Sequence, residues 1–147
     1  MHTSCRPLPP HFLLLLQAKA PALVTLFHEL RAYIWQLFPA GNELLYHTHA
    51  LTAVYSISDK LADAYCMIPV YTHHLHLGFN KGTLLPDPHQ CLTGTGKLIR
   101  HVPVTQRAHF ENQAVTQLVQ AAIAFALKNT NKPCTVTGTT LSKIKMA

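Results

Sequence analysis

Charge is scarce in this chain. Charged residues make up 12% of its 147 residues and only six residues are acidic, whereas 48% are apolar. This composition excludes intrinsic disorder, which requires few apolar residues and much charge. A chain of this length buries enough surface to be stable as one domain. The low charge also predicts an apolar surface that meets a partner, such as a second subunit.

Long apolar runs are also missing. No run approaches the roughly 20 apolar residues that a membrane span needs, so we expect no membrane partner. The run "FLLLL" at 12–16 lies between Arg6 and "AKA" at 18–20, as in a secretory signal. It is shorter than the roughly seven residues of a signal core, so we interpret it as part of a helix.

Closely spaced cysteines are absent as well. No two of the four cysteines have the spacing of a zinc knuckle or a redox dithiol. We therefore expect reduced thiols in a cytoplasmic protein. The cysteines are Cys5, Cys66, Cys91 and Cys134.

The charge that is present is unevenly distributed. The net charge is +6, and residues 74–147 carry all of the excess, with eight basic residues against Asp87 and Glu111. A basic half favours anionic partners only through non-specific attraction. Half of these basic residues follow residue 127 and belong to an expected tail, so nucleic acid is an unlikely partner on sequence grounds.

The apolar spacing predicts two helices, then strands, then a third helix. Residues 11–19 and 23–38 have helical periodicity, and Pro39 to Gly41 end the second helix. Alternation of period two then predicts strands, and Glu111 opens the last helix. The predicted strands cover 43–49, 50–57, 65–72, 74–80 and 97–104. Pro69 indicates an edge position or a bulge in the third strand.

These elements predict an α+β fold with a curved antiparallel sheet of about five strands. The N-terminal and C-terminal helices cover one face of the sheet. We divide the chain into an N-terminal extension (1–10), a domain (11–127) and a basic, flexible tail (128–147). Three helices cover only one sheet face, so the other face is free to meet water, a ligand or a partner.

Histidine is abundant, with eleven residues. His74 and His76 lie two apart in a predicted strand and therefore share a face, as do His47 and His49. Such a pair can chelate a divalent metal ion if a third ligand completes the site. The candidates for that ligand are His101, Asp87 and His89. Alternating polar residues on a solvated sheet face produce the same pattern without any metal.

The segment "LLPDPHQCLTGTGKLIRH" at 84–101 is the most distinctive loop. It is not a phosphate-binding P-loop, because Leu98 follows the lysine and the segment leads into a strand. Backbone N–H groups of its glycine turn, with Lys97 and Arg100, can still hold an anion. Catalysis through Asp87, His89 or Cys91 is a further alternative, although neighbours in a loop rarely share the required geometry.

The stretch 74–102 resembles the YdhG-like family, a bacterial group of small domains that are largely uncharacterised. Its pattern is a strand ending in Leu-Gly-Phe, then Leu-Pro-Asp-Pro, a Gly-Thr-Gly-Lys turn and an Arg-His strand. "YSIS" at 55–58 and the helix ending at Pro39 also match, and the resemblance covers about 11–127. The matching loop residues are Leu77, Gly78, Phe79, Gly82, Leu85, Pro86, Asp87, Pro88, Leu92, Gly94, Thr95, Gly96, Lys97, Arg100 and His101.

The resemblance implies an α+β domain with a curved antiparallel sheet and flanking helices. Some relatives are described as frataxin-like iron chaperones, which implies iron that is held and passed on. Frataxin-type sites use clustered carboxylates, and this chain has only six acidic residues. Its histidine pair suits softer divalent ions better.

Together these observations predict a non-enzymatic cytoplasmic domain that binds a small ligand or a metal ion where the open sheet face meets the loop 80–96. His74 and His76 would supply imidazoles to a metal. Lys97, Arg100 and His101 would supply positive charge to an anion, and Asp87 would anchor the loop. Metal binding fails below about pH 6, whereas anion binding strengthens there. The alternative is an interaction module whose open face forms a homodimer.

Overall fold

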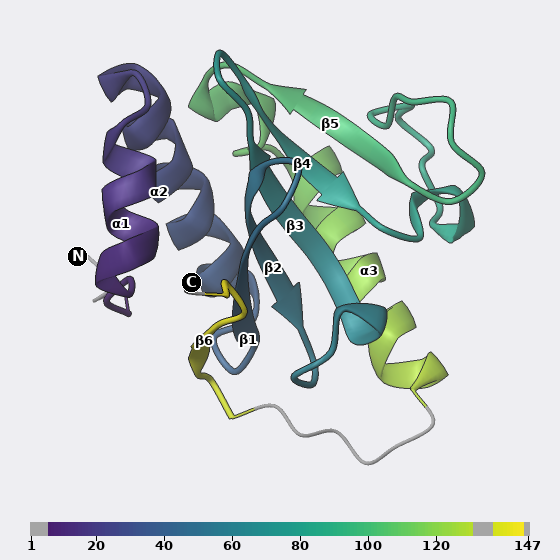
Figure 1. The fold of residues 1–147 in the computed structure, drawn as a ribbon. Helices are drawn as coiled ribbons and strands as arrows, with labels where there is room; N and C mark the ends of the chain where they lie inside the picture. Colours follow the sequence, from purple (N-terminus) through teal and green to yellow (C-terminus); the bar gives the residue numbers. More distant parts are fainter. Residues whose placement is uncertain (1–5, 131–136, 146–147) are drawn as a thin grey trace.

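The computed structural model describes residues 6–130 and 137–145, which form three α-helices and a six-stranded sheet (Figure 1). The helices are α1 (Pro10–Gln17), α2 (Pro21–Leu37) and α3 (Gln113–Asn129). The strands are β1 (Asn42–His47), β2 (Leu51–Ser56), β3 (Ala64–Val70), β4 (Leu75–Phe79), β5 (Arg100–Val104) and β6 (Thr140–Ser142). The predicted α+β class is confirmed.

The helix boundaries follow from local chemistry. Pro21 stands in the first turn of α2, where its missing N–H costs nothing. The N-cap of α3 is Asn112, whose side-chain oxygen accepts a hydrogen bond from the N–H of Val115 at 2.8 Å. The helix therefore begins two residues after the predicted start at Glu111.

The sheet has the order β5-β4-β3-β2-β1-β6. β1 to β5 are antiparallel neighbours joined in chain order, as predicted, and β6 adds a parallel strand beside β1. Pro69 lies in the inner strand β3 rather than at an edge, and the irregularity of β3 lies at Tyr65, where the register with β2 shifts, rather than at the proline. The pairs between β3 and β4 are Met67 with Gly78 and Val70 with Leu75, which lie on either side of the proline.

The expected tail from residue 128 contains regular structure that the sequence did not predict. Its first two residues end α3, and Thr140–Ser142 form β6. Asn42 fixes this strand, since its Oδ1 accepts hydrogen bonds from the Thr137 N–H, the Thr137 hydroxyl and the Thr139 N–H. Residues 131–136 and 146–147 of the tail lie outside the described part.

All three helices pack on one face of the sheet and share a single apolar core with it. This core joins Phe12, Phe27 and Leu118 of the helices to strand residues such as Leu77 and Val102. In the view of Figure 1, α1 and α2 lie to one side and α3 lies behind the strands. Within the described ranges, no helix covers the opposite sheet face, as predicted.

A buried ion pair lies where α2 meets β1. The Arg31 guanidinium donates twice to the Glu43 carboxylate at 2.8 Å, and both side chains are almost fully buried. The hydroxyls of Tyr55 and Thr140 donate to the same carboxylate at 2.6 and 2.9 Å. Glu43 thus connects α2, β1, β2 and β6, and the added hydrogen bonds compensate for burying its charge.

In the described residues, no helix is both long enough and apolar enough to cross a membrane.

Candidate functional site

Four rings form a continuous row on the helix-free face: Tyr71, His74, His76 and His101, called here the histidine row. The row starts at the turn between β3 and β4, where the Tyr71 N–H donates to the His74 carbonyl at 2.8 Å and places both rings on one face. Ring centroids are 4.7 Å apart for Tyr71 and His74 and 5.0 Å for His74 and His76. His76 and His101 stack at 3.9 Å with 9° between their planes.

The surroundings of the histidine row keep the imidazoles of His76 and His101 uncharged near pH 7. Burial, followed by the nearby His101 and His74, lowers the pKa of His76 from 6.5 to about 4. Burial and His74 also lower the pKa of His101. Near pH 7 these two rings therefore offer stacking surfaces and hydrogen-bonding nitrogens rather than positive charge.

The stacked arrangement does not form a metal site as it stands. Imidazole lone pairs lie in the ring plane, so two parallel stacked rings do not aim their nitrogens at one point. A hydrogen bond also engages His101, whose Nε2 lies 3.1 Å from the Thr93 hydroxyl. Over residues 6–130 and 137–145, no three His, Cys, Asp or Glu side chains are placed to hold a metal ion.

The predicted loop residues have separate positions. The carboxylate of Asp87 accepts hydrogen bonds from the N–H groups of Cys91 and Leu92, each at 2.9 Å, so it anchors the loop. Arg100 is paired with Phe79 and projects to the core side of the sheet, away from His101. Its guanidinium donates to the carbonyls of Gly96 and Ile99. Lys97 and His89 are exposed on the loop. The structure therefore brings His74, His76 and His101 together but not the loop cations.

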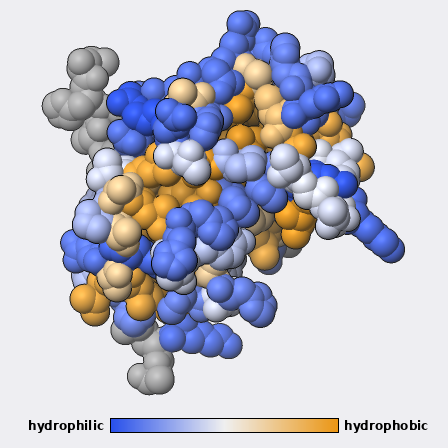
Figure 2. Space-filling view, turned by 90° about the horizontal axis from the view of Figure 1, so that it is seen from above, coloured by the Kyte–Doolittle hydropathy of each residue, from blue (hydrophilic) through white to orange (hydrophobic). Residues whose placement is uncertain are grey.

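An apolar groove adjoins the histidine row at the end of the molecule where α1 turns into α2. We call it the end groove. It consists of two open depressions of about 460 and 210 Å³ that share Ala20 and His73. His74 lines the smaller depression and so belongs to both the groove and the row. Figure 2 looks onto this end from above and shows hydrophobic surface between hydrophilic flanks. The groove is lined by Leu15, Ala18, Lys19, Ala20, Ala22, Leu23, Leu26, His47, Leu51, Thr72, His73, His74, Val104 and Thr105.

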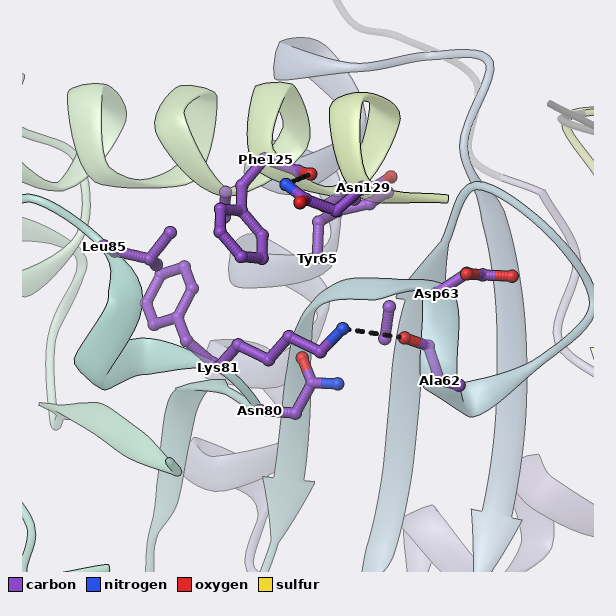
Figure 3. A pocket seen from close by; sticks show the side chains of 12 residues that line it. Ala62, Asp63, Tyr65, Asn80, Lys81, Leu85, Phe125 and Asn129 are labelled. Carbon is purple, nitrogen blue, oxygen red and sulfur yellow. Dashed lines mark hydrogen bonds between the residues drawn. The ribbon is translucent and has the colours of Figure 1, made fainter. Parts of the chain in front are cut away.

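A third depression, between α3 and the end of β4, is crossed by a lysine. Its wall includes Tyr65 and Phe125. The Lys81 Nζ lies 5.9 Å from the Phe125 ring centroid and 3.5 Å from the Ala62 carbonyl (Figure 3). Asp63 points away from this lysine in the same view. The chain's own side chain thus occupies the space that a ligand would need.

Sequence reasoning missed Tyr71 and the end groove. Tyr71 could have been found, because a two-residue turn at Thr72 and His73 places residues 71 and 74 opposite each other. The groove could not have been found, because it depends on how the turn between α1 and α2 meets the turn between β3 and β4.

Comparison with known proteins adds no relatives: no family model, curated protein or solved structure matches the chain. The YdhG-like assignment stays a prediction from the loop motif, and a functional proposal depends on the geometry.

Proposed function

We propose that this chain is a non-enzymatic binding domain for a small amphipathic organic ligand. The apolar part of the ligand would lie in the end groove, and its polar or planar part would contact the imidazole of His74. The observation that carries this proposal is the position of His74, which lies at once in the histidine row and in the groove wall.

The size and lining of the groove support a small organic ligand. Such sites usually measure roughly 300–1,000 Å³ and combine apolar walls with a few polar groups. Here alanine and leucine side chains form the walls, while His47, His73 and Thr72 supply polar atoms. The neighbouring imidazole of His76 is neutral near pH 7 and adds no positive charge, so Lys19 is the charged side chain of the groove lining.

A second candidate is a divalent metal ion at His74 and His76. The observation in its favour is the low pKa of His76, because an imidazole must be neutral to bind a metal. The ring of His76 would first have to turn away from His101, since stacking directs its nitrogens elsewhere.

A fluorescence titration with the uncharged probe N-phenyl-1-naphthylamine tests the groove. We expect saturable binding, which Ala20→Trp should weaken about tenfold or more by filling the groove. Ala62→Trp is the matched control, because Ala62 is also an exposed alanine but lines the depression beside α3. Equal binding by both variants, or no saturable binding to the wild-type protein, would rule out the groove.

A zinc titration by calorimetry at about pH 7.5 separates the second candidate from the first. If the metal reading is correct, a His74→Ala and His76→Ala double variant loses zinc binding, whereas Ala20→Trp retains it. Native mass spectrometry of the protein without a histidine tag would then show the mass of either retained ligand.

A further inference from the structure

The loop between β4 and β5 holds three large aliphatic side chains in water. Leu84, Leu98 and Ile99 are 54%, 45% and 59% exposed, respectively. We call these three residues the aliphatic tip. Figure 1 shows the loop extending beyond the β5 edge of the sheet. Neither the histidine row nor the end groove includes any of them, so the proposed ligand site does not explain their exposure.

Hydrogen bonds across the loop hold the aliphatic tip in place. The Thr83 N–H donates to the Leu98 carbonyl at 3.1 Å, and the Thr83 hydroxyl donates to the Lys97 carbonyl at 2.8 Å. These bonds bring the segment with Leu84 beside the segment with Leu98 and Ile99. Asp87 ties the far side of the loop by its two backbone hydrogen bonds.

The base of the loop depends on a glycine. A Cβ at Gly82 would lie 2.5 Å from the Cβ of Arg100, so the two sides of the loop could not approach each other with a larger residue. The aliphatic tip is therefore exposed because the backbone geometry of the loop is fixed, and not because the loop is loose.

Positive charge accompanies the tip. Lys97 is exposed directly before Leu98, and Arg100 follows Ile99. In the described chain neither forms an ion pair, since the pairs present join Arg31 to Glu43 and Arg107 to Glu29 and Glu111. The nearest acidic residue along the loop, Asp87, uses both carboxylate oxygens on backbone N–H groups. The tip is thus both aliphatic and cationic, within a chain of net charge +6.

We propose that the aliphatic tip docks on an anionic lipid surface. Exposed aliphatic side chains gain free energy by entering the headgroup boundary of a bilayer, and adjacent cations are attracted to anionic lipids. A protein partner fits less well, because a stable interface buries about 800 Å² on each side and relies on Trp, Tyr and Arg anchors. Docking of this kind needs no spanning helix, so it would revise our expectation of no membrane partner, which depended only on the lack of a long apolar run.

Co-sedimentation with vesicles tests this proposal. The untagged protein should sediment with vesicles that contain phosphatidylserine and much less with phosphatidylcholine alone, and added salt should reduce binding. A Leu98→Ser and Ile99→Ser double variant should lose about tenfold or more in vesicle affinity. Lys97→Gln should lose about fivefold, and only with the anionic vesicles.

The matched control is a Leu14→Ser and Leu127→Ser double variant. These leucines are 68% and 42% exposed on α1 and α3, so they test aliphatic exposure away from the loop. Equal loss of binding by both double variants, or no binding by wild type, would overturn the proposal. It would also be overturned if the wild-type protein self-associated through the tip, seen as a larger solution mass that the Leu98→Ser and Ile99→Ser variant lacks.

Discussion

The neutral state of His76 has a consequence for stability. Its pKa falls from 6.5 to about 4 on folding, chiefly because the ring is partly buried. Between these values the unfolded chain binds a proton that the folded protein does not. The contribution of neutral His76 to the free energy of unfolding is therefore present above about pH 6.5 and is lost as the pH falls toward 4.

We expect a His76→Gln variant to lose less stability on acidification than the wild-type protein does. Since the ring remains partly solvated, the wild-type protein should lose about 1 kcal/mol of unfolding free energy through this residue on acidification. The variant should lack that part of the loss. Urea unfolding at about pH 7 and pH 4.5 measures it, with His89→Gln as the exposed control. An identical pH dependence for His76→Gln and the wild type would contradict the assignment.

Arg31 and Glu43 form an ion pair that is buried in the protein. Removing one partner leaves the other buried without compensation. We predict that Glu43→Gln lowers the unfolding free energy by about 3–5 kcal/mol. Glu111→Gln, which breaks the exposed pair with Arg107, should lower the unfolding free energy far less. Urea or thermal unfolding compares the two, and similar losses would show that burial of the first pair is unimportant.

Single residues were predictable where they obey periodicity. Alternation placed His74 and His76 on one face, and the next strand added His101. Arg31 was overlooked, although it stands four residues after Phe27 and three before Ile34 and thus lies on the buried stripe of its helix. Nothing local to Glu43 indicates burial, because its partners Arg31 and Tyr55 come from other elements.

At the scale of elements, the helices and the five antiparallel strands were predictable from apolar spacing. β6 was not, because three residues carry no periodicity and its partner β1 is about a hundred positions earlier. Long-range hydrogen bonds decide such a strand, and local propensity contains no information on them. The predicted last strand also began three residues early, since Lys97 to Ile99 belong to the loop.

The contribution of Asn42 to the attachment of β6 can be tested by substitution. Asn42→Ala removes the acceptor of three hydrogen bonds from Thr137 and Thr139, at a cost of about 1–3 kcal/mol. Hydrogen exchange should speed up at the Lys143 N–H, which donates to the Leu45 carbonyl. Asn129→Ala removes a hydrogen bond within α3 and should leave that N–H protected. Unchanged exchange in Asn42→Ala would show that β6 is held by other contacts.

At the scale of the whole molecule, the helix-free face is less open than the sequence suggested. Leu44 and Val54 at its centre are 0% and 2% exposed and pack with Ala64, Tyr46 and Met67. The chain itself covers this part, so the face offers little apolar area to a second copy. The histidine row, toward the β5 side, keeps its contact with solvent.

We therefore expect a monomer in solution. Sedimentation velocity at micromolar concentration should give the mass of one 16.3 kDa chain, with and without zinc. A concentration-dependent dimer that a Tyr46→Ala and Met67→Ala variant dissociates would favour the interaction module instead. A double variant at Leu14 and Leu127, two exposed aliphatic residues on the helices, serves as the control for general surface hydrophobicity.

The parallel strand β6 also bears on how the protein is made. Synthesis proceeds from the N-terminus, so β1 to β5 and α3 are all complete before the ribosome reaches Thr140. Until then β1 is an edge strand whose outer side is unpaired. The Glu43 carboxylate also lacks the hydrogen bond that the Thr140 hydroxyl later donates. The newly made chain is consequently most exposed to strand pairing with other chains just before Thr140 to Ser142 emerge.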